Sequence, residues 1–467
     1  MESLGPKLFV LISFLLLFAF ALRRDRVYIV PFILLFYSNI NGLLGWEDFA
    51  LKGFIKFQDY GLMITLAILA LHIMTFDRHE PDYMKVARRT VLYNAINFFW
   101  INYLVLFVFA VVLQGPVWPV KMARTFFYGL VIYVAYREIM VDPLAKLERL
   151  FRFMMWMTLF FGCLYIIYNV SGWEIYPKGE HEVFKTGYLQ EEDVRRNFSG
   201  FPTFAHFFLF YFVDRILRNE GSRLFNVIGA AILAACVMLV LTRYTLVITI
   251  AVTLFLILYR KQDIRTVGRL AAAAVAFAVL LPLIGLFTET YYTTLISRFD
   301  EFSRSGVLTS SNARVRIDEF KQILSNVMDF NPFFGFGFTV PWGFGYPTNV
   351  YHAGSADNGY ANILGISGFL GLMLFFVLMG SWMVVNRRLR ALEAENLSRV
   401  TFAFIFFVLA GMMNDAHAGY MHYFGIFMAY DLFAYAYLKH KPAVEPIPDP
   451  HRVETAPMQV GDARSAP

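Results

Sequence analysis

The feature that most constrains this chain is a repeated alternation of long apolar runs with short basic loops. The hydrocarbon layer of a bilayer is about 30 Å thick, so a spanning helix needs about 20 mostly apolar residues. Such runs occur near 7–22, 27–45, 59–75, 91–113, 124–139, 153–170, 201–217, 225–241, 244–259, 270–288, 358–384, 401–415 and 420–438. Hydrophobic residues make up 58% of the chain, against about 45–50% in a soluble domain. We therefore predict an all-α integral membrane protein, a polytopic bundle of roughly 12–13 transmembrane helices.

Lysine and arginine are concentrated in every second loop, and this pattern predicts the orientation. The basic loops follow the first, third, fifth, seventh, ninth and eleventh runs, and the positive-inside rule places them in the cytoplasm. Two long loops, near 171–199 and 289–357, therefore face the periplasm or the cell exterior. Loops of this length in a compact domain usually carry a function. We expect one membrane domain over 1–440 and a disordered cytoplasmic tail over 441–467, because the tail is rich in proline and polar residues.

The charge and the cysteines exclude other classes of protein. The net charge of +6 comes from basic residues spread over short loops, and no dense basic tract indicates nucleic-acid binding. Cys163 and Cys236 lie in predicted spans without metal or redox spacing. The first apolar run has no basic segment before it and no small-residue cleavage site after it, so we expect it to be retained as a span.

The second long loop contains a segment, RIDEFKQILSNVM, with the apolar spacing of an amphipathic helix. Five apolar side chains share one face of that predicted helix: Ile317, Phe320, Ile323, Leu324 and Val327. We expect this helix to lie against the membrane surface.

Arginines on the outer side are informative because the positive-inside rule does not require them there. Arg195 and Arg196 end the first long loop, Arg243 lies at the turn between two short spans, and the second long loop contains Arg314 and Arg316. Guanidinium groups bind phosphate oxygens in pairs of hydrogen bonds and stay charged at working pH. We favour an anion site shared by Arg196, Arg243 and Arg316. The alternative is that each arginine pairs with an acidic neighbour or a lipid headgroup.

A candidate general base precedes the eleventh span. Asp357 opens that span, where a carboxylate can accept a proton or cap the helix. His352 lies five residues earlier, and His417 belongs to the last outer turn. No histidine pair has a strong zinc-ligand spacing, so we predict no metal site. Trp342, in a loop rich in glycine and aromatic residues, suits either stacking on a sugar or insertion into the membrane interface.

Four segments, in this order, resemble motifs of the O-antigen polymerase and O-antigen ligase superfamily. They are RRNFSGFPTFAH, LVLTRYTLVI, RIDEFKQILSNVMDFNPFFGFGF and ADNGYANILGISGFLG. The resemblance covers roughly residues 195–375. Three positions depart from the family pattern: Thr242 replaces a serine, Phe320 a tryptophan, and Asp357 the histidine of the ligase branch.

The resemblance implies a membrane glycosyltransferase of the GT-C type that is inverting, metal-independent and free of cofactors. It implies a bacterial inner-membrane location, with an active site that faces the periplasm. The family's phosphate-binding arginines correspond to Arg196, Arg243 and Arg316, with Arg195 and Arg314 left open as the alternative member of each pair. Asp357 would act as the base, with His352 as a second candidate. The expected glycan-binding residues are Asn358, Tyr360, Trp342 and His417.

The sequence thus leads to a functional hypothesis with two alternatives. The hypothesis is polymerisation of oligosaccharide repeat units linked to undecaprenyl pyrophosphate, as in O-antigen, capsule or exopolysaccharide assembly. The Asp-Asn pair at 357–358 favours a polymerase over a ligase that transfers glycan to lipid A-core. A polysaccharide transporter is the second alternative, and it should show broken spans with polar residues at the midplane. Expected partners are the lipid-linked donor and acceptor and the bilayer, with a chain-length regulator and a flippase as candidates, and no nucleic acid.

Overall fold

The computed structural model describes residues 26–37, 57–74, 81–139, 143–171, 201–239, 243–258, 311–340, 358–392, 395–413 and 421–440, with isolated positions between 8 and 19. Every element in these ranges is helical, and no strand occurs within them. The predicted all-α class is confirmed. The predicted span at 270–288 and the tail over 441–467 lie outside the described residues.

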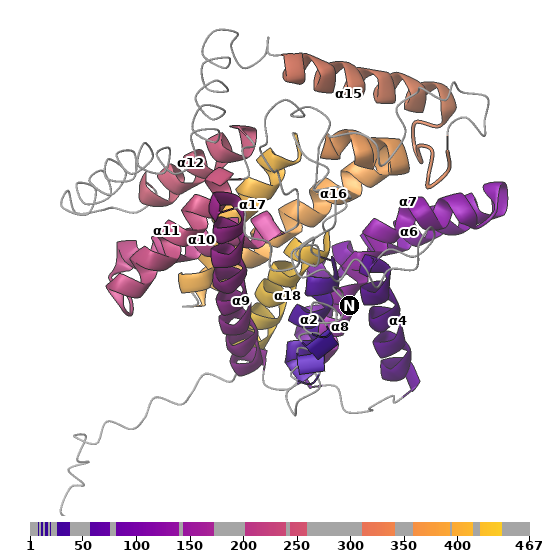
Figure 1. Cartoon of the computed structure of the whole chain (residues 1–467). Helices are drawn as coiled ribbons and strands as arrows, with labels where there is room; N and C mark the ends of the chain where they lie inside the picture. The colour runs from indigo at the N-terminus through magenta and orange to yellow at the C-terminus, as the bar shows by residue number, and fades with distance from the viewer. Residues whose placement is uncertain are drawn as a thin grey trace, which may run out of the picture.

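The helices of the first half of the chain are drawn in indigo and purple in Figure 1. In order they are η1 Arg26–Tyr28, α2 Ile29–Tyr37, α4 Phe57–Met74, α5 Tyr83–Arg88, α6 Val91–Gln114, α7 Val117–Phe127, η3 Tyr128–Leu130, α8 Val131–Ile139 and α9 Pro143–Ser171. The helices of the second half are α10 Phe201–Arg218, α11 Arg223–Leu239, α12 Arg243–Leu258, α15 Ser311–Phe330, α16 Gly359–Ala391, α17 Glu395–Gly411 and α18 Met421–His440.

Several predicted spans correspond closely to helices, and two differ. The predicted span at 124–139 is not one continuous α-helix, because the 3-10 segment η3 separates α7 from α8. The helix predicted at 153–170 begins earlier, at Pro143. The basic segment before the predicted span is therefore helical as well. Three described helices are long and apolar enough to cross a membrane: Val91–Gln114, Pro143–Ile167 and Gly359–Ala391. Four more are apolar but shorter. These helices support a membrane protein.

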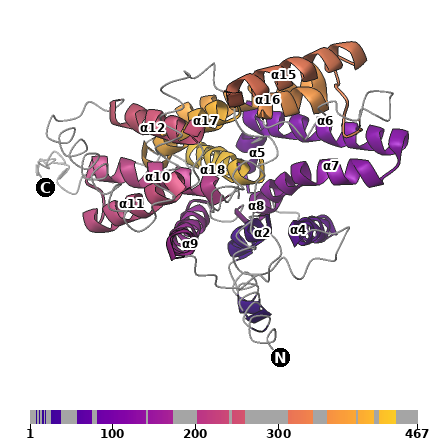
Figure 2. The ribbon, with the colours of Figure 1, turned by 45° about the horizontal axis from the view of Figure 1, so that its top comes forward.

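Helix α18 runs through the centre of the bundle (Figure 2) and packs against α5, α8, α9 and α16. Phenylalanine rings fill the space around it. Phe207 of α10 stacks on Phe427 of α18 with ring centroids 3.9 Å apart. Helix α6, in contrast, is exposed along one side, where Val105, Val108 and Val112 are not covered by other helices. A row of exposed valines on an apolar helix is what a lipid-facing surface requires.

Helix α16 is broken at Gly368, whose φ of 60° and ψ of −159° are not helical. A break inside an apolar helix leaves backbone groups without partners, which is costly unless other protein groups satisfy them. The turn over 331–340 supplies those partners. Four backbone hydrogen bonds of 2.8–3.2 Å join the turn to the break: Phe336 N–H to Gly365 O, Gly337 N–H to Ile366 O, Phe369 N–H to Pro332 O, and Leu370 N–H to Phe333 O.

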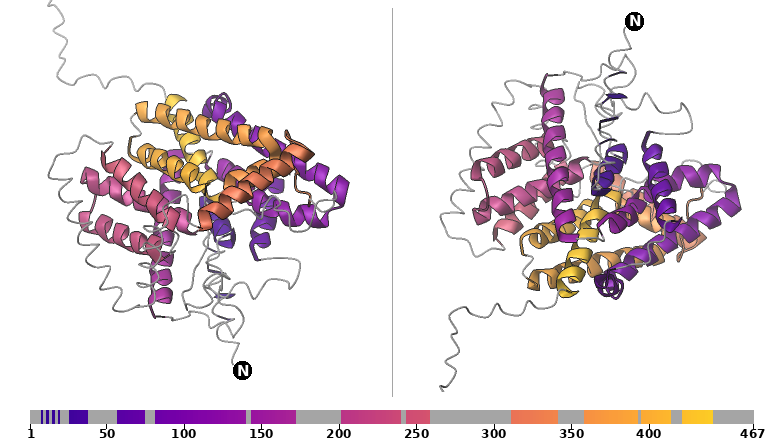
Figure 3. Two further views of the ribbon diagram at one scale, coloured as in Figure 1. Left: turned by 90° about the horizontal axis from the view of Figure 1, so that it is seen from above. Right: turned by 90° about the horizontal axis from the view of Figure 1, so that it is seen from below.

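Helix α15 crosses the start of α16 at one end of the bundle (Figures 1 and 3), and the two helices are in direct contact. The start of α16 follows the second long loop, so this end is opposite to the basic loops. We call it the outer end. The predicted amphipathic helix is confirmed as a helix, and part of its apolar face packs on α16.

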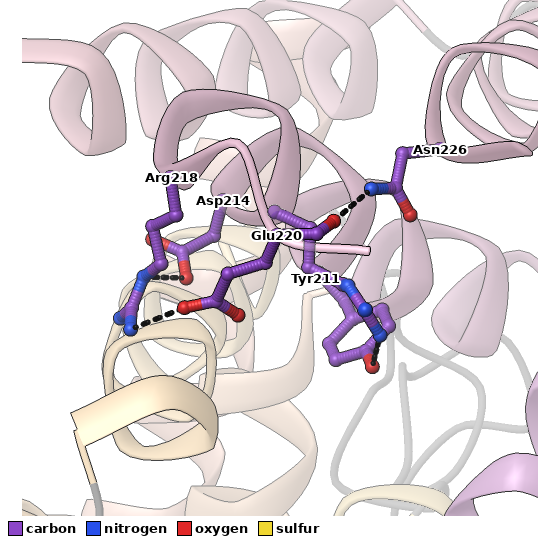
Figure 4. A network of polar contacts seen from close by, with 6 residues as sticks. Tyr211, Asp214, Arg218, Glu220 and Asn226 are labelled. Atoms are coloured by element: carbon purple, nitrogen blue, oxygen red, sulfur yellow. Dashed lines mark hydrogen bonds and ion pairs between the residues drawn. The ribbon is translucent and has the colours of Figure 1, made fainter. Parts of the chain in front are cut away.

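The turn between α10 and α11 is held by a polar network (Figure 4). Arg218 forms a buried ion pair with Asp214 at 2.8 Å and reaches Glu220 at 3.4 Å. The side-chain amide of Asn226 donates to the Glu220 carbonyl at 2.7 Å. The arginines of this predicted cytoplasmic loop therefore shape the turn in addition to marking orientation, since Arg215 also donates to the Tyr211 hydroxyl.

We expect Gly368→Ala to destabilise the protein strongly. A Cβ atom there would lie 2.6 Å from the Pro332 carbonyl oxygen, and the backbone has a positive φ that L side chains rarely adopt. The cost should be about 2–3 kcal/mol or more, measured by thermal unfolding of the purified protein in detergent. Gly380→Ala in the same helix is the matched control, because nothing lies within 4 Å of its added Cβ. We call the four hydrogen bonds between the turn and the break of α16 the interlock. Equal melting temperatures for the two variants would show that the interlock does not constrain α16.

Candidate functional site

The candidate site is the outer end, where α15, the turn over 331–340 and the first segment of α16 meet. A small apolar cluster joins them, formed by buried Ile323 and Val327 of α15, Phe336 of the turn, and Ala361 and Leu364 of α16. The α15 side chains of this cluster lie together because apolar residues spaced three or four positions apart share one face of a helix. The cluster fixes α15 to the broken helix.

Phe320 and Ile317, both predicted on the apolar face of this helix, have different environments. Phe320, which replaces the family's tryptophan, is partly buried and packs against this cluster. Ile317 is 41% exposed, so it lies outside the part of the apolar face that packs on α16. The packed face instead continues from Val327 through Ile323 and Phe320 to Arg316, because these positions repeat every three or four residues. Glu319 is buried on this side of the helix as well.

This spacing distinguishes the two arginine positions of α15. Arg316 is partly buried and lies on the face that packs on α16. Positions 314 and 316 are separated by about 200° around a helix, so they lie on nearly opposite faces. Position 316 is therefore the one of the pair that is directed toward the rest of the candidate site.

Asn358 is the N-cap of α16. Its side-chain oxygen accepts from the backbone N–H groups of Tyr360 and Ala361, at 3.0 and 3.1 Å. The capping role considered for Asp357 is thus performed by Asn358. The preceding N–H group, that of Gly359, donates to the Met412 carbonyl at 2.8 Å. Helix N-termini often bind phosphate through such N–H groups, but the first three of α16 already have partners.

Tyr360 connects the start of α16 to the end of α17. Its hydroxyl donates to the Leu409 carbonyl at 2.6 Å, and its ring stacks on Phe376. Together with the bond from Gly359 to Met412, this contact holds residues 358–360 in place. Both Asn358 and Tyr360 therefore have structural roles. Their predicted contacts with glycan remain predictions.

The turn over 331–340 is anchored at its far end to α6. Gln114 exchanges two hydrogen bonds with the backbone of Val340, at 2.9 and 3.1 Å. Phe338 is fully buried among aromatic rings of α6 and α7. Phe333 and Phe334 are exposed on the other side of the turn, at 69% and 49%. Trp342 lies outside the described residues. Its two predicted roles, stacking on a sugar and insertion into the membrane interface, therefore remain predictions.

Most of the predicted catalytic residues also lie outside the described residues. These are Arg195, Arg196, His352, Asp357 and His417. For Arg243 and Arg314 the structure describes only the backbone. Helix α11 ends at Leu239 and α12 begins at Arg243, and the residues between them lie outside the described residues. The shared arginine site remains a prediction.

The sequence analysis missed three buried polar residues near the site. Asn362 and Ser367 lie in the short segment of α16 before the break, and His206 stacks on Phe407 at 4.3 Å. The Ser367 hydroxyl donates to the Ile363 carbonyl within the helix. A polar residue inside an apolar run was the available signal. Across the described ranges, no cluster of three or more His, Cys, Asp or Glu could hold a metal ion.

Comparison with known proteins finds one match, over part of the chain. A family model described as O-Antigen ligase matches residues 228–376. This match supports the resemblance to the O-antigen polymerase and ligase superfamily, and with it a glycosyltransferase-like enzyme. The matched segment begins within α11 and contains α12, α15, the turn over 331–340 and the broken part of α16. No curated protein matches the chain.

We expect Asn358→Ala to lower the free energy of unfolding by about 1 kcal/mol, because the cap of α16 is lost. Asn358→Asp is the matched control, since its carboxylate oxygen still accepts from the same two N–H groups. Thermal unfolding of both variants should show a lower midpoint for the alanine variant alone. If the aspartate variant melts as early as the alanine variant, the cap is not what stabilises this helix start.

Proposed function

We propose, from the family match over 228–376, that this protein polymerises oligosaccharide repeat units linked to undecaprenyl pyrophosphate. It would act on the periplasmic face of the bacterial inner membrane. One observation carries this proposal. The matched segment includes the assembly of α15, the turn over 331–340 and the first part of α16, which lies at the end opposite to the basic loops. A transferase of lipid-linked sugars needs a rigid site at the membrane surface, where both substrates are anchored.

Arginine side chains supply the positive charge for the donor pyrophosphate in this proposal. The first three N–H groups of α16 are occupied, so phosphate binding depends on side chains. We assign this role to Arg196, Arg243 and Arg316, with Arg195 as the alternative to Arg196. The helical geometry of α15 favours Arg316 over Arg314, because only position 316 lies on the face that packs on α16. Guanidinium groups would stabilise the charge that develops on the leaving pyrophosphate.

Asp357 is the proposed general base, and His352 is the second candidate. Asp357 directly precedes Asn358, whose position is fixed by the cap and by the contacts of Gly359 and Tyr360 with α17. A base must be held within hydrogen-bond reach of the proton that it accepts. The acceptor hydroxyl oxygen forms a bond to the anomeric carbon as the bond from that carbon to the pyrophosphate breaks. The hydroxyl proton passes to the carboxylate, and undecaprenyl pyrophosphate leaves with the bonding electrons. A single displacement inverts the anomeric centre without a metal or cofactor.

Trp342 and His417 are the residues we favour for sugar contacts. Asn358 and Tyr360 were also expected to bind glycan, but each is engaged in holding the start of α16. An aromatic ring such as Trp342 offers a flat apolar face to a sugar. The expected partners are two lipid-linked glycans and the bilayer, with a chain-length regulator and a flippase as candidates.

A ligase is the second candidate function, because the matching family model carries that description. A ligase would transfer finished glycan to lipid A-core or another acceptor. A transporter is less well supported, although α16 is broken as transporter helices often are. In transporters the ends of broken helices contact the substrate. Here the backbone groups at the break bind the protein's own turn.

We expect Arg316→Ala to reduce product formation by about 100-fold, as loss of one donor to a developing anion usually does. The measurement is the rate at which purified protein converts a synthetic undecaprenyl-pyrophosphate repeat unit into a ladder of longer products. Lys321→Ala is the matched control, because Lys321 is an exposed cation on the same helix. We expect the control to keep normal activity. Equal rates for both variants and the parent, with normal folding, would remove Arg316 from the site.

The same assay distinguishes a polymerase from a ligase. A polymerase should produce the ladder from lipid-linked repeat units alone. A ligase should produce no ladder, and should transfer glycan only after lipid A-core is added. Asp357→Asn should abolish the ladder, with a loss of about 100-fold or more for a missing general base. A full ladder from that variant would contradict the role proposed for Asp357.

A further inference from the structure

An exposed apolar stripe runs along α16 after the break in that helix. Its members repeat every three or four residues, so they lie on one face of the helix. They are Phe369, Met373 and Phe376, which are 44%, 55% and 51% exposed, followed by exposed Gly380 and Val384. We call these residues the α16 stripe. The steps of glycan transfer described above assign no role to it.

The stripe contacts the candidate site at Phe376. The Phe376 ring stacks on Tyr360, with ring centroids 5.8 Å apart. Tyr360 follows Asp357, the proposed base, by three residues, and its hydroxyl is fixed to the Leu409 carbonyl. In a straight helix, residues 360 and 376 would be about 24 Å apart. The break at Gly368 is therefore what brings the stripe to the site.

At Phe369 the stripe meets the turn over 331–340. The Phe369 N–H donates to the Pro332 carbonyl at 2.9 Å, and the adjacent Phe333 is 69% exposed. The stripe therefore contacts the candidate site at two points, the turn and Tyr360.

The side chains of the stripe suit a branched, unsaturated chain. The flat faces of Phe369 and Phe376 offer apolar surface with a π-system, and the flexible thioether of Met373 adapts to irregular shapes. Gly380 leaves a notch beside Phe376, because an added Cβ there would have no atom within 4 Å. An isoprenoid chain has methyl branches and double bonds along its length. Covering the stripe with such a chain contributes binding free energy in proportion to the apolar area removed from contact with solvent.

The donor of the proposed reaction limits where its lipid can lie. Its pyrophosphate connects the sugar to the polyprenyl chain, so a pyrophosphate bound at the site fixes the start of the chain there. The chain is apolar and stays in the bilayer, so it must leave the site over an exposed apolar surface. The α16 stripe is such a surface, and it begins at a residue of the site.

We propose that the α16 stripe is the binding surface for the polyprenyl chain of the lipid-linked donor. This inference rests on the proposed function, from which it takes the donor. The chain leaves the pyrophosphate beside Tyr360, crosses Phe376 and continues past the Gly380 notch to Val384. The chain does not react, so the stripe binds it equally in the ground state and in the transition state. The stripe therefore sets the affinity for the donor and leaves the rate of the chemical step unchanged.

The first test compares two synthetic repeat-unit substrates, one on undecaprenyl pyrophosphate and one on geranyl pyrophosphate, whose chain is too short to cover the stripe. Phe376→Ala and Met373→Ala should each raise KM for the long-chain substrate about fivefold with kcat unchanged. Neither variant should change KM for the short-chain substrate. Phe109→Ala is the matched control, since Phe109 is 54% exposed on α6, and it should leave both KM values unchanged. Equal effects on the two substrates would show that Phe376 and Met373 only support the fold, and would overturn the proposal.

The second test needs no glycan transfer and no variant. Undecaprenyl pyrophosphate with a diazirine in the isoprene units near the pyrophosphate is photo-crosslinked to the purified full-length protein, and the labelled peptides are located by mass spectrometry. We expect labels within residues 369–384 that are removed by excess unlabelled undecaprenyl pyrophosphate and kept in excess phosphatidylglycerol. Labels only elsewhere, or equal competition by the phospholipid, would show that ordinary bilayer lipid covers the stripe and would overturn the proposal. A protein that shows the expected labels but forms no ladder would contradict the proposed polymerase and still support the polyprenyl site.

Discussion

The four backbone hydrogen bonds between the turn over 331–340 and the break of α16 hold the outer end of this protein together. Gly368 interrupts the helix, and the turn supplies donors and acceptors to the groups that the interruption leaves open. Gly335 comes so close to the break that an added Cβ would lie 2.6 Å from the Gly365 carbonyl oxygen. Neither partner is stable alone in an apolar setting, because unpaired backbone groups there are costly. The turn and the broken helix therefore stabilise each other.

The remaining contacts of the outer end build on this interlock. The turn continues from α15, so fixing the turn also fixes the helix that contains Arg316. The cluster around Ile323 and Val327 then seals α15 against the first segment of α16. At the other side, Tyr360 and Gly359 attach that segment to α17. The segment matched by the O-antigen ligase family model contains the interlock and ends soon after it.

Some of this arrangement could be predicted, and the reasons differ from element to element. The helix over 316–328 followed from its apolar spacing, and the division into two short helices, α11 and α12, followed from the shortness of the two apolar runs. The glycines at 335, 337 and 368 gave no indication of their partners, because a positive φ is a local property and the break is a contact between segments. Asp357 and Asn358 were equally good caps by sequence. Only the backbone path into α16 decided that the Asn358 oxygen reaches the N–H groups of Tyr360 and Ala361. The exposure of Ile317 could not be predicted for a similar reason, since an apolar pattern does not show which part of it a neighbouring helix covers.

The sequence by itself determined that this is a helical membrane protein, which loops are basic, and which family its motifs resemble. These properties depend on apolar length, on charge counted along the chain and on residue order, and none of them needs a contact between distant residues. The tertiary structure decided that α16 is broken and filled by its own turn, that Arg316 lies on the packed face of α15, and that the Phe376 ring stacks on Tyr360. Those outcomes depend on which backbone and side-chain groups meet across the bundle, and hydrogen bonds between segments far apart in sequence leave no periodic trace in either segment.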